Sequence, residues 1–313
     1  MPTTQDVKSL LQGVVDGNWY RVTEVSERIA KKLAKQGHKE DAEWIKDEVA
    51  KRNMPEYVQN GNDTPWYHET RPETKLDDLI VHDNIKKQIQ EILTEYSKRQ
   101  FLKEHDLNNA NKILLIGNAG TGKTMTAEIL AHELDLPLKT VRQENLIDSK
   151  MGQTAENLDL IMPSYQRQMT FPAVYFFDEF DTLASKRITA AHASDREYNE
   201  ITNVLLKEMD HLDSDSFFVA ASNLADGFDP AVYRRFDTII KFPDADLKTT
   251  RYLFERHLDL DNYQLSDDLV KRLTKFPPSV IKQIAFDVKK HCLLYDQAIT
   301  DDLILQIAKT KQI

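Results

Sequence analysis

Cysteine and long apolar runs are scarce in this chain of 313 residues, and each shortage excludes a class of protein. The one cysteine, Cys292, excludes an internal disulfide and a thiolate metal cluster, which suits a reducing cytoplasm. No apolar run approaches the ~20 residues that a membrane-spanning helix needs, so we expect no membrane insertion. The first residues lack a basic segment followed by an apolar one, so we expect no signal peptide.

Basic residues are also in the minority. The 41 Lys and Arg residues against 51 Asp and Glu residues give a net charge of −10, which makes broad nucleic-acid binding an unlikely role because that binding relies on cations at phosphates. The apolar fraction of 41% and the charged fraction of 29% are ordinary for a globular protein. The length allows two or three small domains.

A glycine-rich stretch, KILLIGNAGTGKT at 112–124, is the strongest signal in the sequence. An aliphatic run at 112–116 predicts a buried strand, and the eight residues after it fit the phosphate-binding pattern G-x-x-x-x-G-K-[ST]. The alternative is a plain glycine turn between a strand and a helix. The predicted nucleotide-binding residues here are Gly117, Asn118, Ala119, Gly120, Thr121, Gly122, Lys123, Thr124 and Met125.

Each residue type in this loop has an expected task. Positive φ at the three glycines would turn backbone N–H groups toward a phosphate, and the helix that follows would direct the positive end of its dipole at the same group. Lys123 would neutralise the β- and γ-phosphates, and the Thr124 hydroxyl would bind Mg²⁺.

Four more apolar runs predict strands, at 137–141, 173–177, 217–221 and 238–242. Helical patterns precede or separate these strands, at 84–98, 157–168 and 198–212. We expect Asp83 to cap the first of these helices. This alternation predicts an α/β fold with a parallel sheet. From 247 onward the pattern is entirely helical.

Polar residues follow two of these strands. Asp178 and Glu179 end the strand at 173–177, where the aspartate would hold Mg²⁺ and the glutamate would polarise an attacking water. A charged pair can also simply terminate a strand, but its place about fifty residues after the glycine loop favours a nucleotide hydrolase. Asn223 follows the strand at 217–221 and would lie beside the γ-phosphate. The guanine-type pattern at 74–77 precedes the glycine loop, so we treat it as accidental and expect ATP.

Two adjacent arginines, Arg234 and Arg235, follow in the stretch DPAVYRRFD at 229–237. They are either a solvated surface pair or cations offered to the ATP of a neighbouring subunit.

From about residue 76 onward the chain resembles an AAA ATPase module. The resemblance rests on LDDLIVHDNIKKQI, GNAGTGKT, YFFDEFDTL, Ser222-Asn223 and the arginine pair, which is most similar to the Vps4, katanin and spastin branch. It implies a P-loop NTPase sheet of order 5-1-4-3-2, a C-terminal helical lid, and an adenine pocket lined by Leu79 and Ile80. It also implies arginine fingers that act in trans in a homo-hexamer or spiral, and an intersubunit role for Arg196.

The chain departs from that family at two places. Polypeptide-threading members carry an aromatic residue in the first pore loop, where this sequence has Lys150-Met151-Gly152. The lid segment that usually reads SGAD is Pro277-Pro278-Ser279-Val280, with no arginine there and Lys282 nearby.

We therefore predict an N-terminal helical domain at 1–52, a linker at 53–75, an AAA core at 76–245 and a lid at 246–313. The N-terminal helices would be either a solvated bundle or a docking domain. The function we expect is ATP-driven remodelling of a protein partner. The alternatives are a regulatory ATPase that gates a separate effector such as a protease, and a DNA-associated helper ATPase, which the acidic charge disfavours.

Overall fold

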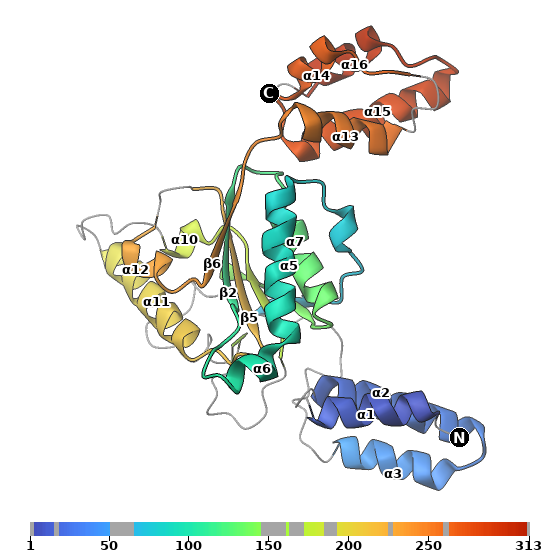
Figure 1. Cartoon of the computed structure of the whole chain (residues 1–313), viewed down its shortest axis with the longest axis vertical. Coiled ribbons are helices and arrows are strands. Elements are labelled where there is room, and N and C mark those ends of the chain that lie inside the picture. The colour runs from blue at the N-terminus through green and yellow to red at the C-terminus, as the bar shows by residue number, and fades with distance from the viewer. Residues whose placement is uncertain are drawn as a thin grey trace.

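The computed structural model describes three successive parts of the chain, coloured from blue to red in Figure 1. They are an N-terminal helical unit, an α/β core and a C-terminal helical lid. The described residues are 3–15, 19–50, 66–144, 161–162, 172–184, 193–224, 228–258 and 263–311.

The N-terminal unit consists of α1 (Thr4–Val15), α2 (Trp19–Lys35) and α3 (Lys39–Ala50), with α2 packed against both others. Gly37 takes a φ of 91° in the turn between α2 and α3, a conformation that glycine adopts without steric cost. The buried Asp6 carboxylate ties α1 to α2, since Arg28 Nε lies 3.2 Å and Lys32 Nζ 2.6 Å from it. Hydrogen bonds to this carboxylate from Lys32 and Thr3 hold its pKa well below the ordinary value.

The core is a six-stranded sheet in the order β1-β3-β4-β5-β2-β6. Five strands are parallel and reproduce the predicted order 5-1-4-3-2, so the predicted fold class is confirmed. They are β2 (Lys112–Gly117), β3 (Leu138–Val141), β4 (Val174–Phe177), β5 (Phe217–Ser222) and β6 (Thr238–Phe242). Every residue of β4 and β5 is buried, which explains their unbroken apolar sequences.

The sixth strand, β1 (Tyr67–Thr70), was not predicted. It lies within the segment 53–75 that we expected to be a linker, and it pairs antiparallel with β3, with Tyr67 opposite Val141. The Arg142 N–H extends this pairing by donating to the Trp66 carbonyl at 2.8 Å. Its sequence, YHET, has one apolar residue, so nothing in its composition separates it from the polar stretch around it.

Helices cover both faces of the sheet (Figure 1). On one face lie α10 (Asp181–Ala184), α11 (Ala193–Asp210) and α12 (Pro230–Tyr233), and on the other α5 (Asp83–Ser97) and α7 (Lys123–Glu133). The short α6 (Arg99–Lys103) follows α5. Asp83 is the first residue of α5, and His82 takes the cap position without a side-chain hydrogen bond, so our cap assignment was wrong by one residue.

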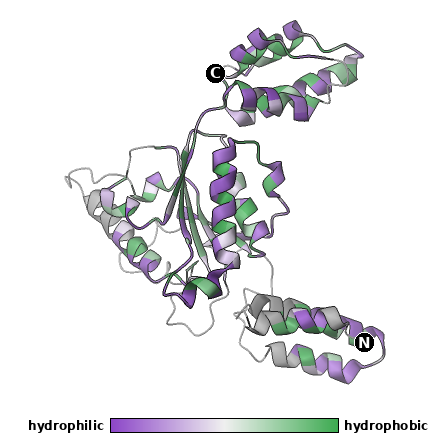
Figure 2. Cartoon of the chain, in the orientation of Figure 1, coloured by the Kyte–Doolittle hydropathy of each residue, from purple (hydrophilic) through white to green (hydrophobic). Residues whose placement is uncertain are grey.

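The lid contains α13 (Leu247–Leu258), α14 (Asp267–Leu273), α15 (Pro278–Tyr295) and α16 (Asp301–Lys309) around its own apolar core. In Figure 2 apolar residues are concentrated on the strands and recur along one side of the lid helices. Among the described helices, none is both long and apolar enough to cross a membrane. The predicted domain limits at 52, 75 and 245 stay predictions.

Candidate functional site

The glycine loop connects β2 to α7 at the carboxyl end of the parallel strands. Gly120 and Gly122 have φ values of 76° and 107°, as we expected. Gly117 is not in the positive-φ region, so that part of the prediction was wrong. A Cβ on Gly117 would lie 2.7 Å from both the Cβ and the carbonyl oxygen of Phe242, so glycine is needed there for the close approach of β6.

Lys123 is the first residue of α7 and only 7% of it is exposed. Its Nζ donates to the carbonyls of Gly117 at 2.7 Å and Asn118 at 2.9 Å, and to Asn223 Oδ1 at 2.8 Å. Burial lowers the pKa of Lys123, and Asp178 and Asp181 oppose this shift. The ammonium group is therefore fixed inside the loop, in contact with the asparagine that we expected to lie near a γ-phosphate.

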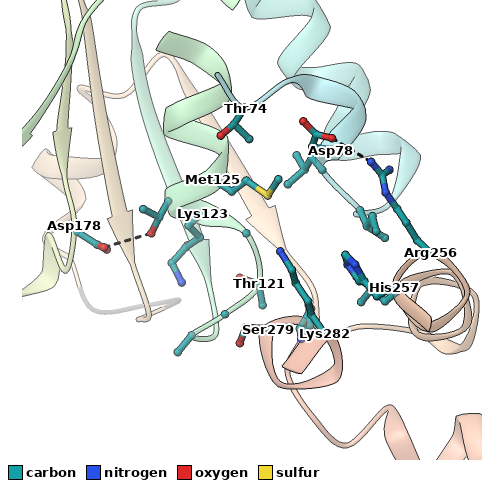
Figure 3. Close-up of a pocket in the computed structure, with 18 of the residues that line it drawn as sticks. Thr74, Asp78, Thr121, Lys123, Met125, Asp178, Arg256, His257, Ser279 and Lys282 are labelled. Carbon is teal, nitrogen blue, oxygen red and sulfur yellow. Dashed lines mark hydrogen bonds and ion pairs between the residues drawn. The ribbon is translucent and has the colours of Figure 1, made fainter. Parts of the chain in front are cut away.

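Thr124 and Asp178 lie next to each other, with Thr124 Oγ1 3.4 Å from Asp178 Oδ2, as the dashed line in Figure 3 marks. Both residues are exposed and line the same cavity. A hydroxyl and a carboxylate are oxygen ligands of the kind that Mg²⁺ takes when phosphates and water complete its shell. The described residues contain no cluster of three or more His, Cys, Asp or Glu that could hold a metal without such help.

Glu179 has an unusual backbone for a residue with a side chain, at a φ of 49°. Its N–H donates to Asp178 Oδ1 at 2.9 Å, and the side-chain amide of Gln143 donates to the Asp178 carbonyl. Thr182 Oγ1 in turn donates to Gln143 Oε1 at 2.6 Å, which fixes the amide orientation. We did not predict Gln143, although it stands two residues beyond a predicted strand, at the edge of the sheet where Asp178 also lies.

A cavity of about 750 Å³ extends from this loop to the lid. Leu79 and Ile80, which we expected beside an adenine, line it, as do Glu179 and Asn223. The lid contributes Arg256, His257 and Lys282, which point into the site in Figure 3 and for which we predicted no role. Burial, with Lys282 and Arg256 nearby, lowers the pKa of His257. Ser279 N–H donates to the Gly120 carbonyl at 3.1 Å and joins lid to loop.

The arginine pair does not line this cavity. Arg235 Nε lies 3.3 Å from Asp210 Oδ2 and its Nη1 donates to the Ala231 carbonyl at 3.1 Å, while Arg234 is exposed. Arg196 lies on α11. The predicted helix at 157–168 and the segment Lys150-Met151-Gly152 lie outside the described residues, apart from 161–162.

The sequence was also compared with known families. A model of the family described as "ATPase family associated with various cellular activities (AAA)" matches residues 113–244. This matched region is similar to an AAA domain. It runs from β2 to just beyond β6 and therefore includes the glycine loop, Asp178, Glu179, Asn223 and the arginine pair.

Two relatives and one solved structure show how far the similarity extends. An uncharacterized AAA family ATPase, y4kL, of Sinorhizobium fredii is 35% identical over 176 residues, which are 56% of this chain and 52% of that protein. Proteasome-activating nucleotidase 2 of Haloferax volcanii is 30% identical over 192 residues, 59% of this chain and 46% of its own length. The chain thus spans about half the length of these relatives. A crystal structure of the FIGL-1 AAA domain has the same fold, with a TM-score of 0.61 at 17% identity, covering 82% of this chain and 90% of that one.

Proposed function

We propose that this protein hydrolyses ATP at the cavity between the glycine loop and the lid. The observation that carries the proposal is the convergence of Lys123, Asn223, Thr124 and Asp178 at one end of that cavity, with Leu79 and Ile80 along its wall. A cation, a polar amide, a metal-binding pair and an apolar wall together fit a nucleoside triphosphate with Mg²⁺.

Each side chain then has a defined task. Lys123 and the N–H groups of the loop bind the phosphates, and Thr124 with Asp178 would hold Mg²⁺, which supplies charge neutralisation to the β- and γ-phosphates. The Glu179 carboxylate orients a water for in-line attack and takes its proton. Asn223 contacts the γ-phosphate while its partner Lys123 turns from the loop carbonyls to the nucleotide.

The test is a pair of variants with different expected failures. Lys123→Ala should lose ATP binding, whereas Glu179→Gln should bind ATP and turn it over roughly 10²- to 10⁴-fold more slowly. Glu91→Gln removes an exposed carboxylate outside the cavity and should match the wild type. Normal turnover by Glu179→Gln in a phosphate-release assay would refute the assignment of the base.

We further propose that the active form is an oligomer, a homo-hexamer or spiral, in which Arg234 and Arg235 of one subunit act on the ATP of the next. The support is their position outside the cavity of their own chain, together with the resemblance of the pair to arginine fingers. The single cysteine supports a cytoplasmic location.

Hydrolysis would drive remodelling of a protein partner. The alternative, a regulatory ATPase that gates a separately encoded protease, is supported by the name of the Haloferax relative, which activates a proteasome, and by the non-aromatic segment Lys150-Met151-Gly152. Changing Lys150 and Met151 to Ala separates the two. If this double variant still activates the effector while Glu179→Gln does not, gating is favoured. If both variants fail to activate it, threading of a polypeptide is favoured.

A further inference from the structure

Residues 71–80, which follow β1, run along α7 to the cavity and form what we name the strap. Three hydrogen bonds attach it to α7. His132 Nδ1 bonds the Pro72 carbonyl at 3.0 Å, Thr74 Oγ1 donates to Glu128 at 3.0 Å, and Leu76 N–H donates to Glu133 at 3.3 Å. The strap ends in a 3₁₀ turn (Leu76–Asp78) followed by Leu79 and Ile80, the apolar wall of the site.

Arg256 connects the lid to the turn in this strap. It stands on α13, and its Nη1 donates to the Asp77 carbonyl at 2.8 Å while Nη2 donates to Asp78 Oδ1 at 3.1 Å. Figure 3 shows this bridge crossing from the lid helix to the strap. Arg256 also lines the cavity itself, next to His257. The planar guanidinium can hold a carbonyl and a carboxylate at once, which a lysine cannot do with the same geometry.

The bridge lies at the apolar end of the cavity, whereas Ser279 joins lid and loop at the phosphate end. Leu79 and Ile80 belong to the strap, and Ile80 also packs against the apolar core of the lid, so movement of the lid away from the strap would widen the cavity around a base seated there. The strap is attached to α7 by the three bonds described above, so separation of lid and strap is the easier route, and Arg256 opposes it.

We propose that Arg256 is a positioning residue that latches the lid to the strap and thereby sets the rate at which nucleotide leaves the site. The proposal rests on the proposed nucleotide site. The latch acts on nucleotide residence and leaves the hydrolytic groups Glu179 and Asn223 in place.

Release of N-methylanthraniloyl-ADP, followed by fluorescence after mixing with excess ADP, tests this. Arg256→Ala should release the probe roughly three- to thirtyfold faster, the range expected for one or two charged hydrogen bonds at a partly exposed site. Asp78→Asn keeps an oxygen that can accept the Lys75 N–H and removes the charge that faces Arg256, so it should accelerate release by a smaller factor, because the bond to the Asp77 carbonyl remains. The double variant should release no faster than Arg256→Ala alone.

A matched control is available on the same helix. Arg251 makes the same kind of bridge within the lid, to the Leu265 carbonyl at 2.9 Å and to Asp267 at 2.6 Å, so Arg251→Ala should leave release unchanged. Arg256 and Asp78 side chains are 35% and 45% exposed, so added salt should speed release from the wild type more than from Arg256→Ala.

The possible outcomes are distinct. Equal release from Arg256→Ala and Arg251→Ala would overturn the latch. Faster release from Arg256→Ala would also overturn it if Asp78→Asn had no effect and the wild type and Arg256→Ala responded equally to salt, since nothing would then tie the effect of Arg256 to the strap. If the wild type binds the probe no better than Lys123→Ala, the proposed site itself fails.

Discussion

At the scale of single residues, the glycine loop shows that one residue type can serve two purposes. Gly120 and Gly122 are needed for their positive φ, which the local pattern predicts. Gly117 is needed because β6 passes close to it at Phe242, a neighbour that no local pattern identifies. A motif thus predicts which residues are needed, but the reason for each depends on contacts from distant parts of the chain.

Gly117→Ala should therefore destabilise the core through crowding. The new methyl group would force β2 and β6 apart and cost roughly 1–3 kcal/mol of unfolding free energy, measured by urea denaturation. Gly37→Ala is the contrast, because Gly37 has a φ of 91° but open space around it, so strain alone acts there. A wild-type midpoint for Gly117→Ala would show that the strand contact is looser than described.

The lowered pKa of His257 predicts a pH dependence of stability. Between that lowered value and the ordinary 6.5, the unfolded chain binds a proton that the folded chain does not. The free energy of unfolding should therefore fall as pH decreases through about 6.5 and level off below the folded pKa. In nucleotide-free protein, His257→Gln should lack this pH dependence. The free energy of unfolding of the wild type minus that of the variant should therefore decrease as the pH falls. A difference that is constant with pH would contradict the assignment.

At the scale of elements, the apolar runs and the strand–helix alternation were enough to predict the five parallel strands, and the resemblance supplied their order. The positions of Asp178 and Asn223 at the cavity were predictable, because the carboxyl ends of parallel strands meet at one edge of a sheet. Strand β1 was missed because its four residues owe their conformation to pairing with β3 rather than to their own sequence. Arg256 and His257 were missed because only the packing of the lid brings α13 to the cavity.

Truncation should show that β1 and the strap are part of the folding unit of the core. A chain that begins at residue 66 keeps the pairing with β3 and the bonds to α7. One that begins at 76, the predicted core limit, loses the pairing and the two bonds made by Pro72 and Thr74. The shorter chain should lose on the order of 2–4 kcal/mol, because several net hydrogen bonds are removed and the edge of β3 is exposed. Urea-denaturation midpoints of the two truncated chains measure this difference in stability. Equal midpoints would support the original boundary at 75.

At the scale of the whole molecule, one chain supplies a cavity lined by the glycine loop, the Thr124–Asp178 pair and Glu179, but its arginine pair lies elsewhere. Arg235 is occupied by Asp210 and the Ala231 carbonyl of its own chain, on the face of the sheet that carries α11 and α12. If the pair serves catalysis, it must serve another subunit, and each site is complete only between two chains.

Mixing two inactive variants tests this division. Arg235→Ala should assemble but hydrolyse ATP slowly, since loss of an arginine finger typically costs on the order of 10³-fold or more. Glu179→Gln has a dead site but intact arginines, so in mixed oligomers it can complete the intact site of an Arg235→Ala neighbour and restore part of the turnover.

The intrachain contact of Arg235 needs its own control. Asp210→Asn removes the ion-pair partner and keeps the arginine, so it should retain turnover if the finger role is correct. Slow turnover in Asp210→Asn, together with no recovery on mixing Arg235→Ala with Glu179→Gln, would mean that Arg235 serves only the packing of α11 against α12. Recovery on mixing can arise only if each variant supplies what the other lacks at a shared site, because neither chain carries both groups intact.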